Sequence, residues 1–205
     1  MAELKNIIFD LGGVLLNIDY NKTKLSFEEL GFNDFDHMYS QYSADMLFSD
    51  LETGKISNEH FSDYLVKKAA GKINAAQIST AWNAMLLDFR LDSLAFLEEL
   101  AKKYTLYLLS NTNSIHLQAF GQIFTKATGK ASLNDYFTKA YYSNEVGLRK
   151  PNEDIFEFVL QDAGIKAEES LFIDDSWNNI DTAKKMGFKT HLLLAGERIE
   201  QLEYV

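Results

Sequence analysis

A short apolar run near the start of the chain ends in a single aspartate. Ile7–Phe9 leads directly into Asp10, and Gly12 and Gly13 follow closely. Such a run predicts a buried strand of a parallel sheet, and glycines allow a sharp turn with close approach by other groups. We therefore expect Asp10 at the carboxyl end of a strand, where open α/β sheets bind ligands. A carboxylate there can be a metal ligand, a nucleophile or both.

Further apolar runs with strand character recur along the chain, and helical patterns separate the later ones. The alternation predicts an α/β fold in which a Rossmann-like parallel sheet is sandwiched by helices. The predicted strands are Ile7–Phe9, Thr105–Leu109, Ala140–Tyr142, Leu171–Ile173 and His191–Leu194. The predicted helices of this part are Leu91–Lys103, Asn152–Ala163 and Trp177–Met186.

One long segment breaks this alternation, because residues 21–88 contain no convincing strand pattern. They form four helix-like blocks instead, and short helices of this kind suggest a small bundle. We therefore predict an all-helical cap, residues 21–88, inserted into a Rossmann-like catalytic core of residues 1–20 and 89–205. The four blocks are Thr23–Leu30, Asp34–Phe48, Ser57–Ala70 and Ala75–Leu86.

The composition restricts the partners and the chemistry. The 205 residues are 46% hydrophobic, carry a formal net charge of −10 and include no cysteine. The negative charge argues against nucleic acid and anionic membranes as main partners, and the lack of cysteine excludes a thiolate nucleophile. The chain starts without a signal-peptide pattern and has no membrane-spanning apolar run, so we expect a cytoplasmic protein. Nothing in the sequence indicates its oligomeric state.

Polar side chains suited to chemistry follow four of the apolar segments. They are Asp10, the run Ser110–Asn113, the run Arg149–Pro151 and the pair Asp174–Asp175. Singly, most have ordinary structural explanations as turns, helix caps or solvated charges. The acid pair is harder to explain this way, because adjacent carboxylates at the end of a buried strand repel each other. A metal ion is the usual remedy.

Taken together, these groups form a consistent set, because the carboxyl ends of parallel strands meet along one edge of a sheet. Asp10 and Asp175 can hold a hard divalent cation there. Ser110 and Lys150 can bind an anionic group on its other side. The pattern therefore predicts a phosphoryl-binding site with a carboxylate directed into it.

At this point the chain resembles the haloacid dehalogenase superfamily. Its four motifs occur in the family's order, and the helical segment between the first two is similar to the family's first type of cap. The segments 110–113 and 147–151 resemble a subgroup that includes sugar-1-phosphate phosphatases and the N-terminal phosphatase domain of soluble epoxide hydrolases. The motifs are Phe9–Val14, Leu109–Thr112, Arg149–Pro151 and Ile173–Asp175, with Asn179 and Asp181 beyond.

The resemblance implies a Mg²⁺-dependent phosphatase that acts on a small phosphorylated metabolite such as a sugar phosphate. Asp10 would attack phosphorus and form an aspartyl-phosphate. Mg²⁺ would be held by Asp10, the backbone carbonyl of Gly12 and Asp175. This agrees with the general expectation that phosphoryl transfer relies on positioning and charge stabilisation.

The resemblance also implies a phosphate-binding set. Ser110 and the amide of Asn111 would hold the transferring oxygens, and Lys150 would neutralise the charges of nucleophile and phosphate. Three loops that are distant in the sequence would thus contribute to one anion site.

One position departs from the family pattern. Phosphatases of this superfamily usually carry a second aspartate two residues after the nucleophile, as general acid and base, and here that position is Gly12. Such help is worth about 10²- to 10⁴-fold. Either another group, with Asp19 as one candidate, replaces it, or substrates with good leaving groups need none, or activity is slow or lost. The sugar-1-phosphate subgroup also has glycine here, which favours an active enzyme.

Two alternatives to the phosphatase stay open on the sequence alone. A metal-free 2-haloacid dehalogenase would use Asp10 on carbon, and a non-catalytic binding protein would account for Gly12. Phosphate release with Mg²⁺ and with EDTA separates the three. The substrate is also open: the cap aromatics Tyr20, Phe48, Tyr64 and Trp82 could line a sugar, but such residues more often form a bundle core.

Overall fold

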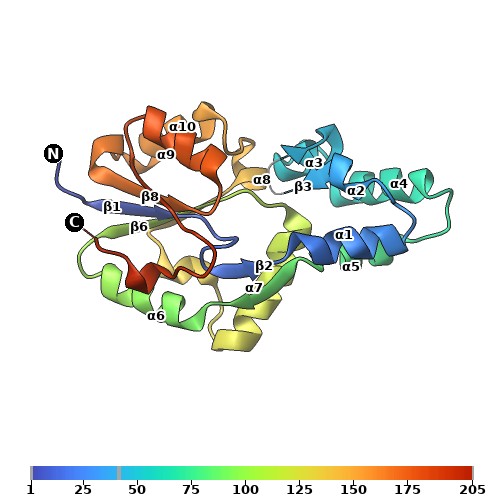
Figure 1. The fold of residues 1–205 in the computed structure, drawn as a ribbon, viewed down its shortest axis with the longest axis horizontal. Coiled ribbons are helices and arrows are strands. Elements are labelled where there is room, and N and C mark those ends of the chain that lie inside the picture. Colours follow the sequence, from blue (N-terminus) through green and yellow to red (C-terminus); the bar gives the residue numbers. More distant parts are fainter. Residues whose placement is uncertain (1, 41–42, 205) are drawn as a thin grey trace.

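The computed structural model describes residues 2–40 and 43–204. Its central sheet has five parallel strands in the order β7–β6–β1–β8–β9 (Figure 1). All five correspond to predicted strands, with bounds that agree within two residues, so the predicted parallel α/β fold is confirmed. The strands are β1 (Asn6–Phe9), β6 (Thr105–Ser110), β7 (Lys139–Tyr142), β8 (Ser170–Asp174) and β9 (Lys189–Leu192).

Helices cover both faces of this sheet, as Figure 1 shows. Alternate residues of β1 point to opposite faces. Ile7 and Phe9 pack with α6 and α7, whereas Ile8 packs with α9 and α10. The sheet therefore separates two apolar cores. The helices are α6 (Leu91–Leu100), α7 (Ser114–Thr128), α9 (Glu153–Ala163) and α10 (Trp177–Lys185), together with the one-turn α8 (Ser143–Val146).

The central position of β1 brings the predicted motifs together. Phe9 is in register with Leu108 of β6 on one side and Ile173 of β8 on the other. The backbone N–H of Asp10 continues the ladder by donating to the carbonyl of Ile173 at 2.9 Å. The ends of β1, β6 and β8 consequently open onto one edge of the sheet, where such folds bind ligands.

A helical segment leaves the core after β1 and returns before α6. It is joined to the core by an antiparallel pair, β2 (Leu16–Ile18) with β5 (Leu86–Phe89), and we call the intervening residues 20–85 the insert. The insert extends to one side of the core (Figure 1). Its helices are α1 (Tyr20–Glu29), α2 (Phe35–Met38), α3 (Met46–Glu52), α4 (Asn58–Lys68) and α5 (Ala75–Asn83).

The insert has an apolar core of its own, built largely of aromatic rings. Phe27 stacks on Phe35 with 4.3 Å between ring centroids, and Phe48 lies edge-on to Phe61 at 5.3 Å. Trp82 contacts the same cluster and is fully buried. Aromatic pairs of this geometry add stability beyond the area they bury.

The prediction of an all-helical cap is wrong in two places. Within Asp34–Phe48 the helix is replaced by a short hairpin, β3 (Tyr39–Ser40) with β4 (Ser43–Ala44), and Leu86–Phe89 is a strand. Tyr39 is extended because its ring packs edge-on to Trp82 at 4.6 Å, so tertiary contacts override local helix propensity. Residues 41 and 42 of the predicted block lie outside the described residues. The division into residues 1–20, 21–88 and 89–205 stays a prediction.

Among the elements of the core that were not predicted are the strand β2 and the helix α7. β2 has only three residues, too few for a recognisable period. The helix α7 begins after Asn113, whose side chain accepts from the N–H of His116, and ends at Gly129 with a left-handed φ of 72°. The Asn113 side chain and the left-handed Gly129 are common N-terminal and C-terminal helix caps.

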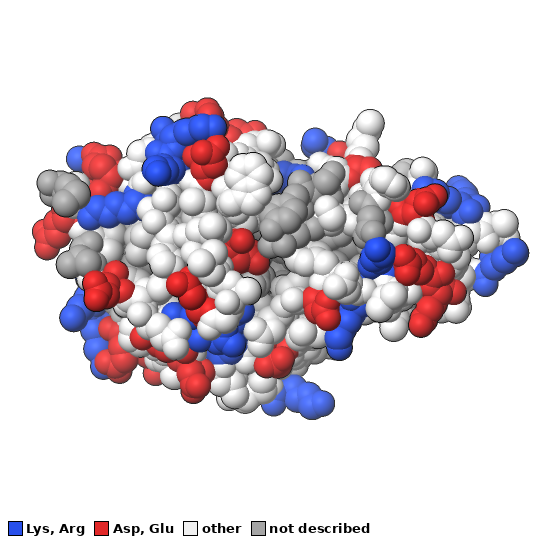
Figure 2. Space-filling model, viewed as in Figure 1, with Lys and Arg blue, Asp and Glu red and all other residues white. Residues whose placement is uncertain are grey.

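The surface offers no single dominant charge on the face drawn in Figure 2, where basic and acidic side chains are interspersed. Within the described part of the chain, no helix is long and apolar enough to cross a membrane.

Candidate active site

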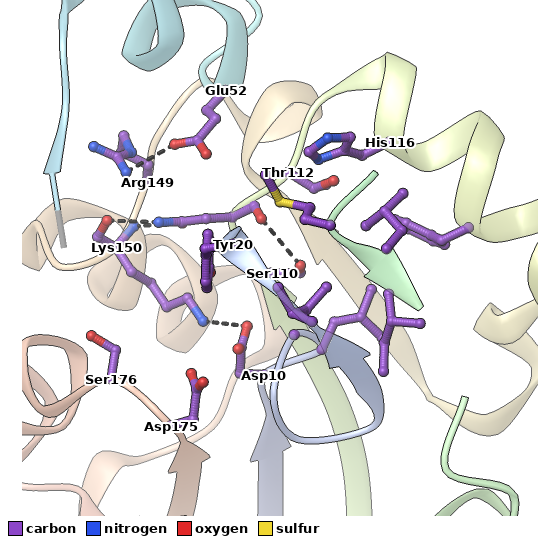
Figure 3. Close-up of a pocket in the computed structure, with 18 of the residues that line it drawn as sticks. Asp10, Tyr20, Glu52, Ser110, Thr112, His116, Arg149, Lys150, Asp175 and Ser176 are labelled. Atoms are coloured by element: carbon purple, nitrogen blue, oxygen red, sulfur yellow. Dashed lines mark hydrogen bonds and ion pairs between the residues drawn. The ribbon is translucent and has the colours of Figure 1, made fainter. Parts of the chain in front are cut away.

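The residues that the motifs single out line one pocket at the carboxyl edge of the sheet (Figure 3). The cavity measures about 90 Å³, which is room for a few water molecules or a small ligand group. Core and insert both contribute to its wall. The predicted site residues found in it are Asp10, Gly12, Ser110, Asn111, Lys150 and Asp175.

A buried ammonium group organises this pocket. Lys150 is 1% exposed, and its Nζ donates to Asp10 Oδ1 at 2.7 Å, to Asp174 Oδ2 at 2.7 Å and to the carbonyl of Leu109 at 2.8 Å. Burial lowers the pKa of Lys150, but the two carboxylates outweigh it and the net shift is upward. Because an ammonium has three N–H donors, a phosphoryl oxygen reaches Nζ only by replacing one acceptor.

Asp174 has a structural task that the sequence analysis did not assign to it. The side chain is fully buried and accepts from Lys150, from the N–H of Ser176 at 2.8 Å and from Asn179 Nδ2 at 3.0 Å. It thus fixes Lys150 and the loop after β8. Asp174 therefore orients Lys150, while Asp175 faces the pocket.

The three carboxylates crowd one another. Asp10, Asp174 and Asp175 each offer an oxygen within 4.8 Å of the others. Burial raises the pKa of Asp10 to about 7 against the opposing effect of Lys150. Burial and the charge of Asp174 raise the pKa of Asp175 to about 6. A divalent cation would relieve this repulsion, and carboxylate oxygens are the ligands that Mg²⁺ prefers, so the donor set fits the predicted metal.

The turn after Asp10 is tight enough to require glycine. Gly13 has a φ of +71°, and a Cβ there would collide with the carboxylate of Asp175. Its N–H donates to the carbonyl of Leu16 at 2.8 Å. The predicted close approach to the glycines is thus confirmed, and Asp175 is the group that approaches. At Gly12 a Cβ would lie 3.2 Å from Cγ1 of Ile18, which is tight but displaceable.

Asn111 ties the second motif to the third. Its Nδ2 donates to the carbonyl of Lys150 at 2.8 Å, and its Oδ1 accepts from the N–H of Lys150 at 2.9 Å. This two-way clamp holds the loop before α9 against the end of β6. The Asn111 side chain is committed to the clamp, which agrees with a phosphate contact through its backbone amide.

Of the four aromatics considered for substrate contact, only one lines the pocket. Tyr20 faces it, while Phe48 and Trp82 are buried in the insert core and Tyr64 is 48% exposed on the surface. Burial, followed by the charges of Asp175 and Asp10, raises the pKa of Tyr20 well above its usual value. Its hydroxyl therefore stays protonated at ordinary pH.

The candidate replacement acid, Asp19, is used elsewhere. Its Oδ1 caps α1 by accepting from the N–H of Asn21 at 3.0 Å, and it does not line the pocket. Asp19 therefore does not replace the general acid that is absent at Gly12. An aspartate just before a helical block is typical of a helix cap, so the sequence already indicated this structural role.

Two charged or titratable pocket residues, Glu52 and His116, were not predicted from the sequence. Glu52 of α3 is 2% exposed and pairs with Arg149, with 2.8 Å between Oε2 and Nη2. His116 of α7 has its Nε2 3.1 Å from the carbonyl of Trp82 and its Nδ1 3.2 Å from Asn113 Nδ2. Burial lowers the pKa of His116 to about 4, so it is neutral, with the proton placed on Nε2 by its partners.

Comparison with known proteins agrees with the site geometry. A family model described as haloacid dehalogenase-like hydrolase matches residues 4–187. The chain belongs to this family. It is 35% identical to a D-ribitol-5-phosphate phosphatase of Bacteroides thetaiotaomicron, over 91% of this chain and 90% of the relative. It is 27% identical to a glyceraldehyde 3-phosphate phosphatase of Methanocaldococcus jannaschii, over 95% and 86%.

Solved structures agree with this assignment. A haloacid dehalogenase family enzyme of Bacteroides thetaiotaomicron, in a mutant complex with magnesium and inorganic phosphate, superposes with a TM-score of 0.89 at 35% identity, covering 97% of this chain and 98% of that one. An L-2-haloacid dehalogenase of Xanthobacter autotrophicus gives 0.59 at 19% identity, over 91% and 76%, which shows the fold alone. The predicted family, phosphatase class and magnesium cofactor are confirmed.

Proposed function

We propose that this phosphatase hydrolyses the monophosphate ester of a small hydroxylated metabolite, with Asp10 as the nucleophile. One observation carries the proposal: Lys150 holds Asp10 at the end of β1 while Asp175 faces the same pocket. A carboxylate fixed by a buried cation beside two further acids suits attack on a phosphoryl group bound with a metal ion. Structural relatives solved with magnesium and phosphate support it.

In this proposal, Mg²⁺ would be held by Asp10, Asp175 and the backbone carbonyl of Gly12. All three line the pocket. When bound, the ion would supply positive charge that makes the carboxylates and the phosphoryl group compatible. Asp174 contributes indirectly, because its oxygens already accept from Lys150 and Asn179.

The proposed reaction has two transfer steps, with Asp10 as the first nucleophile and water as the second. An oxygen of Asp10 bonds to phosphorus while the ester P–O bond breaks, and the departing oxygen takes a proton from water in the pocket. Water then attacks the phosphorus of the aspartyl-phosphate, which releases inorganic phosphate and restores Asp10. Ser110 and the amide of Asn111 would bind the transferring oxygens, and Lys150 would keep Asp10 ionised and aligned.

The substrate class follows from the wall opposite the carboxylates. Hydroxyl, carboxylate and guanidinium groups line the pocket together with apolar side chains such as Met85 and Leu86. Such a lining suits a short carbon chain that carries hydroxyl groups. The 35% identical relative that is a D-ribitol-5-phosphate phosphatase supports a sugar or sugar-alcohol phosphate.

The test is phosphate release from a panel of phosphorylated metabolites with Mg²⁺ and with EDTA. We expect turnover of small sugar and polyol phosphates that EDTA abolishes. A parallel trapping experiment with beryllofluoride should place an adduct on Asp10. Equal activity in EDTA, or no release from any ester on the panel, would refute the proposed function.

A further inference from the structure

One more charged group is buried in the pocket, on the side away from the nucleophile (Figure 3). Glu52, at the end of α3 in the insert, is only 2% exposed and lines the same cavity as Asp10. Burying a carboxylate costs several kcal/mol unless partners compensate. Burial raises the pKa of Glu52, and Arg149 opposes this shift. A residue this unfavourable to bury calls for an explanation beyond packing.

The partners of Glu52 compensate it only in part. Tyr39 donates its hydroxyl to Oε1 at 3.0 Å, and Arg149 Nη2 lies 2.8 Å from Oε2. The second contact is an ion pair. Among the described residues, Glu52 Oε2 and Arg149 Nε are buried without a hydrogen-bond partner. A buried acceptor and a buried donor, both on pocket-lining residues, are thus left with capacity to bond.

The Glu52–Arg149 pair and the nucleophile lie on opposite sides of the pocket. Figure 3 shows Glu52 and Arg149 on one side and Asp10 and Asp175 on the other, with Tyr20 between them. A phosphoryl group seated at Asp10 therefore directs its leaving group toward Glu52. The far end of that leaving group would meet the pair.

A hydroxyl group matches this pair chemically. It can donate its proton to the carboxylate of Glu52 and accept a hydrogen bond from Arg149 at the same time. An aliphatic carbon at that place would offer no hydrogen bond to Glu52 Oε2 or Arg149 Nε, which is costly for buried polar atoms. The pair carries no net charge, so it favours a neutral hydroxyl over a second anionic group.

We propose that Glu52 and Arg149 determine specificity by binding a hydroxyl of the leaving group at its end remote from the phosphate. This inference rests on the proposed phosphatase function and adds the feature of the substrate that the insert recognises. The competing explanation is that the pair only fastens the insert to the core. A test must therefore separate recognition from fastening.

The experiment compares ribitol 5-phosphate with n-pentyl phosphate, which has the same carbon number and type of ester but no free hydroxyl. Both are assayed with Mg²⁺ for kcat and KM. We expect the wild type to prefer ribitol 5-phosphate, and Glu52→Gln to lower the ratio of the two kcat/KM values by about 10- to 100-fold, mostly through KM. Arg149→Lys should lower the same ratio.

A matched control breaks a different contact between insert and core. Ser114 Oγ of α7 donates to Asn58 Oδ1 of α4 at 2.6 Å, and neither residue lines the pocket. Asn58→Ala should leave the ratio unchanged. If Glu52→Gln does not fold, Tyr39→Phe, which removes only the hydroxyl donated to Glu52, provides the test with a smaller fall in the ratio.

The outcomes separate this inference from the proposed function. A wild type that hydrolyses both esters with equal kcat/KM, or a Glu52→Gln variant that changes both equally as Asn58→Ala does, overturns the inference and leaves the phosphatase intact. A wild type that releases phosphate from neither ester, with or without Mg²⁺, counts against the proposed function itself.

Discussion

The carboxylate cluster and the opposite wall of the pocket are built in different ways. The cluster stands on strand ends whose positions follow from parallel pairing around β1. The wall is assembled from Tyr20 at the start of α1, the hairpin residue Tyr39 and the end of α3. Strands hold the reacting groups with little freedom, whereas the insert presents its groups from a separate aromatic core.

This difference suggests that the carboxylate cluster determines the chemistry and that the opposite wall determines the selectivity. The cluster is tied by short charge-assisted hydrogen bonds through Lys150, and such bonds fix geometry tightly. Apart from the ion pair of Glu52 with Arg149, which precedes Lys150 in the chain, the wall faces the cluster across the cavity, so its groups can vary with less effect on the reacting groups. We therefore expect substitutions in the cluster to act on kcat and those in the insert to act on KM.

The largest effect should follow from Asp10→Asn. The change keeps volume and an acceptor for Lys150 but removes the nucleophilic charge, so turnover should fall by roughly 10⁴-fold or more. Steady-state phosphate release measures this, and mass spectrometry of trapped protein looks for the phospho-enzyme. Substrate binding should survive in the variant. Appreciable turnover by Asp10→Asn, or an adduct on another residue, would exclude this mechanism.

Lys150→Met should be the next most damaging. It leaves Asp10 and Asp174 as buried carboxylates without their cation, which costs about 3–5 kcal/mol of unfolding free energy, and turnover should drop about 10²- to 10³-fold. Urea denaturation and kinetics measure the two effects. Lys185→Met, which breaks an exposed pair with Asp181 at 2.6 Å, is the control and should change little. Similar results for both variants would mean that Lys150 does not organise the site.

Much of the core could be predicted from sequence because its determinants are local. An apolar run followed at once by a polar group marks both a buried strand and its carboxyl end, as at Phe9 and Asp10. Parallel pairing then brings such ends together without knowledge of side-chain contacts. The inserted segment resisted prediction where distant contacts decide, since Tyr39 is extended by packing against Trp82, 43 positions away.

The two walls of the pocket differ in the same way. The motif residues Asp10, Lys150 and Asp175 are recognisable from their neighbours in the chain. Nothing near Glu52 in the sequence indicates that it is buried beside Arg149, because that contact exists only once the insert has packed on the core. Arg149 belongs to a predicted motif. Its pairing with the buried Glu52 could not be predicted from the sequence.

A moderate effect concerns pH and the metal. Burial raises the pKa values of Asp10 to about 7 and of Asp175 to about 6. Raised carboxyl pKa values stabilise the metal-free protein at low pH, and this contribution is lost as pH rises through 6 to 7. Mg²⁺ requires the ionised forms, so its affinity should rise at least about tenfold from pH 5.5 to 8. Calorimetric titration with Mg²⁺ checks this. An affinity independent of pH would place the ion elsewhere.

A cavity in the insert should have a smaller effect on catalysis than on stability. Leu65→Ala truncates a fully buried side chain of α4 and should cost about 2–5 kcal/mol, while KM rises severalfold and kcat changes little. Leu97→Ala, a matched cavity under the sheet in α6, should lower stability without changing KM. Thermal unfolding and kinetics measure both. A kcat that falls with Leu65→Ala alone would show that the insert also positions the reacting groups.

The smallest effect tests the acid that is missing beside the nucleophile. Gly12→Asp restores a carboxylate two residues after Asp10, at the cost of moving Ile18, whose Cγ1 lies 3.2 Å from the new Cβ. If protonation of the leaving oxygen limits the rate, an alkyl phosphate should gain severalfold relative to an aryl phosphate, which leaves without help. Gly12→Asn has the same shape but cannot transfer the proton, so it should give no relative gain. Because each variant is scored by the ratio of two esters, a general loss through Ile18 cancels. Equal changes for both esters in both variants would show that the site needs no acid at this position and that glycine serves the turn alone.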